Sequence, residues 1–188
     1  MKSLPQMVLA ALFTGLMVAA TFFVIPIPNV PLVLANCLPW LAALVLGPRW
    51  AAVTVILYLL LGAFGLPVFA KGSSGVGTLF GTTGGFLFGY LLAALLVGFL
   101  RDPEGKSVVK NGIAVVIGLL SAYLLGIPWF AFVYFKGLDG FALTNLVQSI
   151  VWCTGPFFLF VVGDLIKGAA VVAVARLVKP LLPGTAAK

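Results

Sequence analysis

Apolar residues run along this chain in long blocks, separated by short segments that carry proline, glycine or charge. An α-helix needs about 20 apolar residues to cross the hydrocarbon core of a membrane. Six blocks approach that length, and a shorter block over 141–152 predicts a further helix in or near the outer membrane surface. The pattern predicts six membrane-spanning helices, over residues 4–25, 32–47, 50–66, 84–100, 108–127 and 155–178.

Proline helps to place the ends of these predicted helices. Pro26, Pro48 and Pro128 directly follow the first, second and fifth blocks, and proline is poorly tolerated inside a helix. The first block has the length of a full span, and no secretory cleavage signal is recognisable after it, so it is expected to be retained. The expected fold class is therefore all-α, as a single polytopic membrane domain over residues 1–188.

The composition agrees with this class. The chain is 63% hydrophobic and 8% charged, with a mean hydropathy of +1.25. Soluble domains carry about 25% charged residues. Cys37 and Cys153 lie in apolar blocks, where cysteine behaves as a small buried hydrophobic residue, so a disulfide is not expected.

The net charge of +7 comes from basic residues scattered singly near the ends of the blocks. They form no stripe, which argues against nucleic acid as a partner. An even number of spans places both termini on one side, where eight basic residues would lie, against two on the other. The positive-inside rule then predicts that both termini are cytoplasmic. The eight are Lys2, Arg49, Arg101, Lys106, Lys110, Arg176, Lys179 and Lys188, and the two are Lys71 and Lys136.

Catalysis is disfavoured because the chain has no histidine and only four acidic residues. Most zinc sites and many general-base mechanisms depend on imidazole. The segment Gly72-Ser-Ser-Gly75 resembles a nucleophile loop but has no base to activate a serine. We therefore expect neither an enzyme nor a metal site.

Two charged residues, Asp164 and Lys167, lie inside the sixth apolar block. A charge in the middle of a membrane costs about 2.5–3.5 kcal/mol on insertion scales and is usually functional. The i, i+3 spacing places both side chains on one helix face. Counted from Pro156, Asp164 is expected about 12 Å below the outer surface. The pair predicts a binding point for a small solute; the alternative is an ion pair that only locks two helices together.

Glycine is concentrated between residues 62 and 89, where the chain has nine glycines. Such density weakens a helix, so residues 67–83 are expected to form an external loop. Glycines allow backbone N–H and C=O groups to approach a ligand, which favours a lid or pocket over a plain surface loop. The candidate ligand contacts are Phe69, Gly72, Gly75 and Thr83 in this region, with Tyr58 and Asn36 from neighbouring blocks. Trp129 and Trp152 are interpreted first as interfacial anchors.

A stripe of small residues, Ala11, Gly15 and Ala19, follows one face of the first block. Such faces allow two helices to approach closely in lipid. The second helix can belong to this chain or to a partner. No nucleotide-binding motif is present, so any energy-driven activity needs a partner.

Several motifs follow one another in a fixed order along nearly the whole chain. They are Pro26-Ile-Pro28, Leu46-Gly-Pro-Arg49, Gly62-Ala-Phe-Gly-Leu-Pro-Val-Phe-Ala70, Gly81-Thr-Thr-Gly-Gly-Phe-Leu-Phe-Gly89 and Gly163-Asp-Leu-Ile-Lys167. Together these motifs resemble the BioY family. Two departures are visible: Leu34-Ala-Asn-Cys-Leu38 stands where members often have Leu-Gln-Thr-Leu, and the commoner Gly-Pro-Thr-Gly-Gly is Gly81-Thr-Thr-Gly-Gly85.

The resemblance implies a biotin-specific S component, the substrate-binding subunit of an energy-coupling factor (ECF) vitamin transporter. Such a subunit lies in the bacterial plasma membrane, captures biotin from outside, and works with a transmembrane T component and two ATP-binding-cassette ATPases. It needs no cofactor. Ala11, Gly15 and Ala19 would meet the T component. Asp164 would accept N–H bonds from the ureido ring of biotin.

Lys167 has more than one possible role under this resemblance. It would donate to the ureido oxygen or balance the charge of Asp164, and the alternative is that it binds the biotin carboxylate. The competing functions are a stand-alone facilitator, an S component for another small vitamin, and an intramembrane enzyme.

Overall fold

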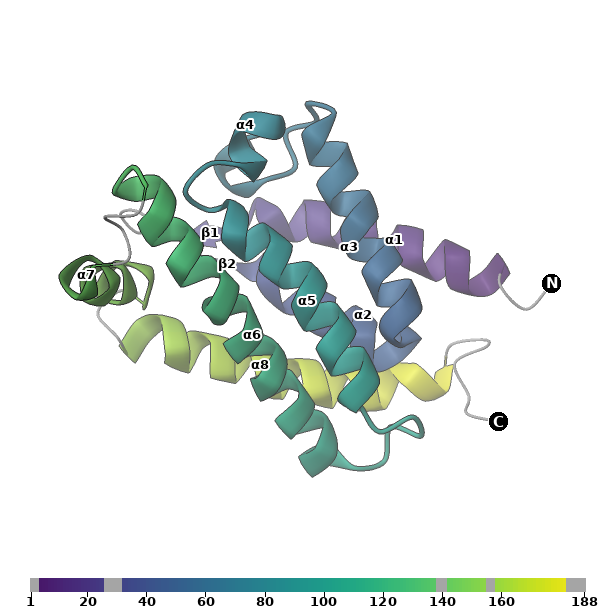
Figure 1. Ribbon diagram of the computed structural model, residues 1–188. Helices are drawn as coiled ribbons and strands as arrows, with labels where there is room; N and C mark the ends of the chain where they lie inside the picture. The colour runs from purple at the N-terminus through teal and green to yellow at the C-terminus, as the bar shows by residue number, and fades with distance from the viewer. Residues whose placement is uncertain (1–3, 26–31, 138–141, 155–157, 182–188) are drawn as a thin grey trace.

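The computed structural model describes residues 4–25, 32–137, 142–154 and 158–181 (Figure 1). In that part of the chain the fold is helical apart from one antiparallel pair of two-residue strands, β1 (Val24–Ile25) and β2 (Leu32–Val33). Three short 3₁₀ helices are η1 (Leu34–Cys37), η2 (Ala70–Gly72) and η4 (Lys179–Leu181). The α-helices are α1 (Leu4–Thr21), α2 (Leu38–Leu46), α3 (Pro48–Ala63), α4 (Val76–Leu79), α5 (Gly84–Leu100), α6 (Val108–Tyr134), α7 (Leu143–Thr154) and α8 (Phe158–Val178).

Helix α5 lies at the centre of the bundle and contacts α2, α3 and α6, while α1 packs on α3 and α8 packs on α2 and α6. Glycines make the closest approaches possible. A Cβ atom at Gly89 would lie 2.9 Å from Ala122 Cα, and one at Gly98 would lie 2.5 Å from Pro48 Cα. These contacts are too short for any larger residue, so α5 can pack this closely only with glycine at both positions.

The expected all-α class is confirmed, but the first two predicted helices have different bounds. Helix α1 ends at Thr21, and the predicted extension to residue 25 is instead strand β1, because Val24 pairs with Val33. The second block is divided into β2, η1 and the nine-residue α2. Pro39 lies in the first turn of α2, where a missing N–H costs nothing, so the regular helix begins at Leu38.

The predicted end of the fifth helix at residue 127 is wrong, because α6 continues through Pro128 to Tyr134. An interior proline costs about 3 kcal/mol. The turns beyond it bury Phe130 and Ala131 completely, and the indole of Trp129 donates to the Gly81 carbonyl. Tertiary contacts therefore hold the helix together beyond a residue that would otherwise end it.

Two other predictions are confirmed as secondary structure. The short helix expected over 141–152 is α7, although residue 141 lies outside the described residues. The glycine-rich region separates α3 from α5 and contains only η2 and the four-residue α4. The path of the chain therefore agrees with a loop in this region.

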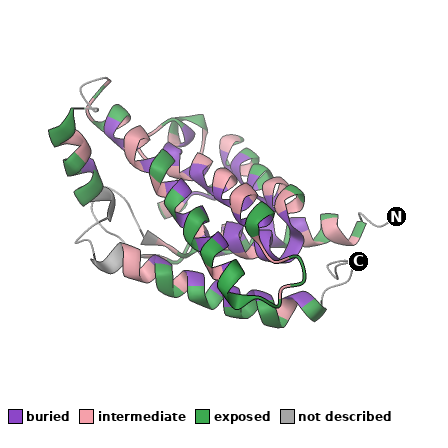
Figure 2. Ribbon diagram, turned by 60° about the horizontal axis from the view of Figure 1, so that its bottom comes forward, coloured by how far each residue is buried: buried purple, intermediate pink, exposed green. Residues whose placement is uncertain are grey.

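By length and composition, α1 and α6 are the helices among the described residues that are long and apolar enough to cross a membrane. The outer faces of the helices are exposed (Figure 2), and many of the residues on them are large and apolar. Leu12, Phe99 and Leu124 each expose more than half of their surface. The first turn of α1 and the last turn of α8 lie on the same side of the molecule (Figure 1). The number of spans and the side of the termini stay predictions.

Candidate functional site

Four polar side chains from three elements form a closed cluster, with Asp164 at its centre. The ammonium of Lys167 lies 2.5 Å from Asp164 Oδ1, which also accepts a 2.9 Å bond from Asn36 Nδ2. The hydroxyl of Tyr123 donates to Asp164 Oδ2 at 2.8 Å. Lys167 Nζ donates further to Asn36 Oδ1 at 2.9 Å and to the Val33 carbonyl at 3.3 Å. Helices α6 and α8 and the segment β2–η1 therefore meet at one carboxylate.

Local backbone structure explains why these groups can meet. Asp164 and Lys167 are one turn apart on α8 and share a face. Asn36 lies in η1, before the regular helix α2 begins. Val33, at the end of the adjoining strand β2, is the N-cap residue of η1, and its carbonyl also accepts a bond from Lys167. Non-helical backbone at such a position is tolerated where polar groups or a cavity satisfy it.

Burial makes this cluster energetically important. Asp164 is 3% exposed, and the side chain of Lys167 is 15% exposed. A buried charge is tolerated when it is paired and its remaining hydrogen-bonding capacity is used. The ammonium of Lys167 donates to three acceptors, and the carboxylate of Asp164 accepts from three donors. Both charges of the cluster are therefore paired and hydrogen-bonded within the protein.

This self-sufficiency determines which ligands can enter. A ligand group has to replace internal bonds with equivalent ones, so it needs N–H donors for the carboxylate and an acceptor for the ammonium, amide or hydroxyl groups. The ion pair itself lies within α8. The contacts of the Asp164 carboxylate to other elements are made through Asn36 and Tyr123, which are exchangeable neutral groups. The arrangement suits a small, neutral, planar group that is both a donor and an acceptor.

Tyr123 was not among the residues selected from the sequence. It lies within the apolar block 108–127 and away from the charged segments that flank the block. Interfacial anchors are found where a span meets water, so a tyrosine inside a span indicates a buried partner for its hydroxyl. That position was the signal that could have identified it.

Tyr58 and Phe69, two predicted ligand contacts, lie together in the core. The Tyr58 hydroxyl donates to the Val68 carbonyl at 2.9 Å and lies 3.2 Å from Thr21 Oγ1. The rings of Tyr58 and Phe69 pack edge to face with centroids 5.5 Å apart. A Cβ atom at Gly62 would lie 2.0 Å from the Phe69 ring. These contacts attach the beginning of the glycine-rich loop to α1 and α3, and a ligand role for either residue stays a prediction.

The other three predicted ligand contacts, Gly72, Gly75 and Thr83, lie outside the core that holds Tyr58 and Phe69. Gly72 and Gly75 have φ values of +70° and +85°, which favour glycine, and no atom lies within 4 Å of a Cβ built on either residue. The Gly75 N–H donates to the Gly62 carbonyl at 2.7 Å. Thr83 is partly exposed and immediately precedes α5. A ligand role for these three residues stays a prediction.

The end of the same loop is attached to α6 by Trp129. Its indole Nε1 donates to the Gly81 carbonyl at 2.9 Å, and its ring packs with Phe80 and Phe88 at centroid distances of 6.4 and 5.8 Å. Gly85 leaves room for this contact, because a Cβ atom there would lie 2.3 Å from Trp129 Cβ. In addition to any anchoring at the interface, Trp129 therefore fixes one end of the loop.

The stripe of small residues on α1 faces away from the other helices. Ala11, Gly15 and Ala19 are all exposed, and no atom lies within 4 Å of a Cβ built on Gly15. Ala11 and Gly15 line a shallow depression together with Val8, Leu12 and Leu16. Internal packing against another described helix is therefore not the use of this face.

Comparisons with known proteins agree on one family. The model of the BioY family matches residues 1–184. The biotin transporter BioY of Thermotoga maritima is 35% identical over 179 residues, covering 94% of this chain and 96% of that protein. The biotin transporter BioY of Rhodobacter capsulatus is 35% identical over 180 residues, covering 93% of each. A crystal structure of the S component for biotin from an ECF-type ABC transporter superposes with a TM-score of 0.79 at 27% identity, covering 93% of this chain and 90% of that chain.

Proposed function

The chain belongs to the BioY family, and we propose that it is the biotin-binding S component of an ECF-type vitamin transporter. The observation that carries this proposal is the buried cluster around Asp164, whose donors and acceptors match a ureido group. Its function is to bind and to reorient with partners, while ATP is hydrolysed by separate subunits.

The ureido ring of biotin has two N–H donors and one carbonyl acceptor. In the proposed complex Asp164 accepts the N–H groups, in place of the bonds that it receives from Asn36 and Tyr123. The ureido carbonyl accepts from Lys167 or from the amide of Asn36. Hydrogen bonds to charged groups in a water-poor site are stronger than neutral ones. Lys167 also remains the ion-pair partner of Asp164.

The rest of the ligand would extend toward the glycine-rich loop. The thiophane ring and the chain are apolar and suit the apolar interior of the bundle. The carboxylate would then meet Lys71, which is exposed and has a left-handed backbone with φ of 60°. Loop N–H groups are the alternative, although those of Gly72 and Gly75 would first have to leave the Phe69 and Gly62 carbonyls. Phe69 and Thr83 stay candidate contacts in this region. In this orientation Lys167 holds the ureido end and not the carboxylate end.

The transport role requires partners that this chain does not contain. We propose a multi-pass subunit in a bacterial plasma membrane with both termini cytoplasmic, which captures biotin from outside. A T component would dock on the exposed face of Ala11, Gly15 and Ala19 and connect the subunit to two ATP-binding-cassette ATPases. Small residues allow the close helix approach that such docking needs.

Uptake of labelled biotin tests this role. Cells that express the chain with the T component and the ATPases should accumulate biotin, and cells that lack the ATPases should not. Gly15→Leu should bind biotin normally but lose uptake, because a large side chain prevents close docking; Gly15→Ala is the matched control and should keep uptake. Equal uptake with and without the ATPases would instead identify a facilitator.

A further inference from the structure

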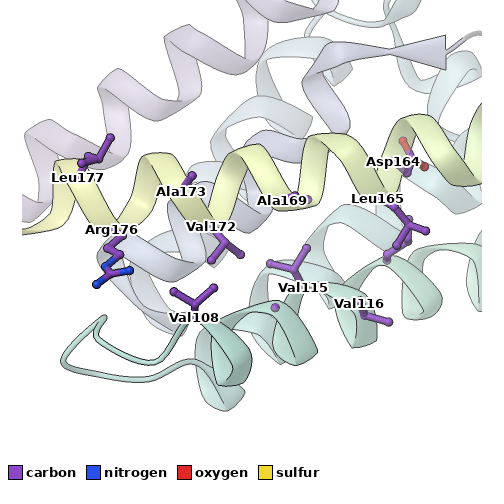
Figure 3. A pocket seen from close by; sticks show the side chains of 13 residues that line it. Val108, Val115, Val116, Asp164, Leu165, Ala169, Val172, Ala173, Arg176 and Leu177 are labelled. Atoms are coloured by element: carbon purple, nitrogen blue, oxygen red, sulfur yellow. The ribbon is translucent and has the colours of Figure 1, made fainter.

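An open groove of about 800 Å³ lies between α6 and α8. Figure 3 shows Asp164 at one end of this groove and Arg176 with Leu177 at the other. Apart from these two charged residues, the lining is apolar. Leu165 and Leu177 are 46% and 72% exposed, so the groove is open to whatever surrounds the bundle.

Small residues hollow out the groove. Gly112 on α6 and Gly168, Ala169 and Ala173 on α8 line it, where larger side chains would fill it. On α6 the lining extends from Val108 to Leu119, which is about 16 Å of helix at 1.5 Å per residue. One leaflet of a bilayer has about 15 Å of hydrocarbon. The groove therefore has the depth of one leaflet.

The groove is long for its volume. Its volume of about 800 Å³ is spread along about 16–20 Å of helix, open on one side and lined by apolar side chains. An extended hydrocarbon chain can lie along such a groove in contact with both α6 and α8.

The charge at the open end selects the kind of headgroup. Figure 3 shows the side chain of Arg176 on the side of α8 that faces the beginning of α6. Arg176 is exposed and forms no ion pair with an acidic residue in the described part of the chain. Arginine binds phosphate groups through a planar fork of N–H donors. Basic pockets between membrane helices are known to bind anionic lipid headgroups.

We propose that this groove is a binding site for an anionic glycerophospholipid. One acyl chain lies along the groove between Gly112 and Ala173, and the phosphate pairs with Arg176. The lipid enters from the leaflet in which the basic ends of the helices lie, and by the positive-inside rule that is the cytoplasmic leaflet. A lipid in this place holds α6 and α8 together below the Asp164 cluster.

Native mass spectrometry of the full chain in detergent tests this proposal, with dioleoyl phosphatidylglycerol and dioleoyl phosphatidylcholine as probes. The wild type should retain one phosphatidylglycerol with about fivefold preference over phosphatidylcholine, the effect of one basic residue near a lipid surface. Arg176→Gln should remove that preference. Ala173→Phe should reduce retention of both lipids, because the ring occupies the groove.

Matched controls exist on the same helices. Lys110→Gln removes a basic residue at the same end that does not line the groove, and Ala170→Phe adds a ring at an exposed position beside it. Both should behave as the wild type, and gel filtration with thermal melting identifies any variant that is misfolded. Because Arg176 is exposed, Arg176→Gln is a test that does not depend on repacking.

Two results would overturn the proposal. One is that the wild type retains phosphatidylglycerol and phosphatidylcholine equally, as Arg176→Gln is expected to do. The other is unchanged lipid retention by Ala173→Phe together with loss of T-component capture, which would assign the groove to a partner helix. Since the readout is lipid mass, the outcome does not depend on whether biotin is the ligand.

Discussion

At the scale of single residues, the site is a buried ion pair whose charges are also hydrogen-bonded to neutral side chains. Asp164 is nearly inaccessible, and its carboxylate has a partner on each oxygen: Lys167 and Asn36 on Oδ1, and Tyr123 on Oδ2. Removing one partner of a buried charge leaves the desolvation cost of the other without compensation. Substitutions in this cluster therefore change stability as well as ligand binding, and the two effects have to be measured separately.

Tyr123→Phe provides a measurement of one such contact. The change removes the donor to Asp164 Oδ2 and keeps the ring, so the ligand-free protein should lose about 1–3 kcal/mol of stability. Biotin should compensate for part of the loss, because a ureido N–H can take the place of the hydroxyl. The measurement is thermal unfolding in detergent with and without biotin.

A double-mutant cycle with Asp164→Asn gives the control for this prediction. If Tyr123 acts through the carboxylate, the cost of Tyr123→Phe should fall when residue 164 is already Asn. The same cost in both backgrounds would show that Tyr123 acts elsewhere.

At the scale of elements, the glycine-rich loop is attached at both ends. Phe69 fills the space beside Gly62 at its beginning, and Trp129 holds the Gly81 carbonyl at its end. Between these points the glycines at 72 and 75 have backbone conformations that other residues rarely adopt. Movement is therefore expected in the middle of the loop, with both ends fixed.

Trp129→Phe should release one end only. The change keeps an aromatic ring against Phe80 but removes the bond to Gly81, which is worth about 0.5–1.5 kcal/mol. Hydrogen exchange at the amides of residues 81–84 should become about 2–13-fold faster. Amides at Val68 and Phe69 should not change. The control is Trp50→Phe, near the beginning of α3 and away from the glycine-rich loop, which should leave exchange at residues 81–84 unchanged. Unchanged exchange at residues 81–84 in Trp129→Phe would contradict the role given to Trp129.

The elements also show where prediction from the sequence fails. Apolar blocks predicted α3, α5 and α8 closely, because in these elements composition and helix agree. The block at 32–47 is as apolar but becomes a strand, a 3₁₀ turn and a short helix, because strand pairing with β1 and Pro39 compete with the helix. Pro128 was expected to end a helix that tertiary contacts continue. In these cases a contact distant in sequence overrides the local preference.

At the scale of the whole molecule, the site exists only because three distant segments meet. Asp164 and Lys167 could be identified from sequence, since a charge in an apolar block is conspicuous. Asn36 could be proposed, but its bond to Asp164 depends on how η1 packs on α8. The position of Tyr123 inside a span indicated a buried partner, but that this partner is Asp164 is seen only once α6 is placed beside α8. Local patterns thus identify the charges, and packing determines which neutral groups surround them.

The outward face of α1 is a second property of the whole molecule. A small-residue stripe alone has two uses, and only the assembled bundle shows that this one points outward. The lipid-sized groove lies on another side, between α6 and α8. We therefore propose that partner docking and lipid binding use separate surfaces and do not compete.

The central claim is that Asp164 holds the ureido group of biotin, and the most direct test is biotin affinity by isothermal titration calorimetry of the wild type and Asp164→Asn. Replacing a charged acceptor by a neutral amide should weaken binding by about 10–150-fold, the equivalent of about 1.5–3 kcal/mol. The double variant Asp164→Asn with Lys167→Met leaves no unpaired buried charge. It should fold and should bind biotin as weakly as Asp164→Asn alone. Unchanged biotin affinity in either folded variant would contradict the account.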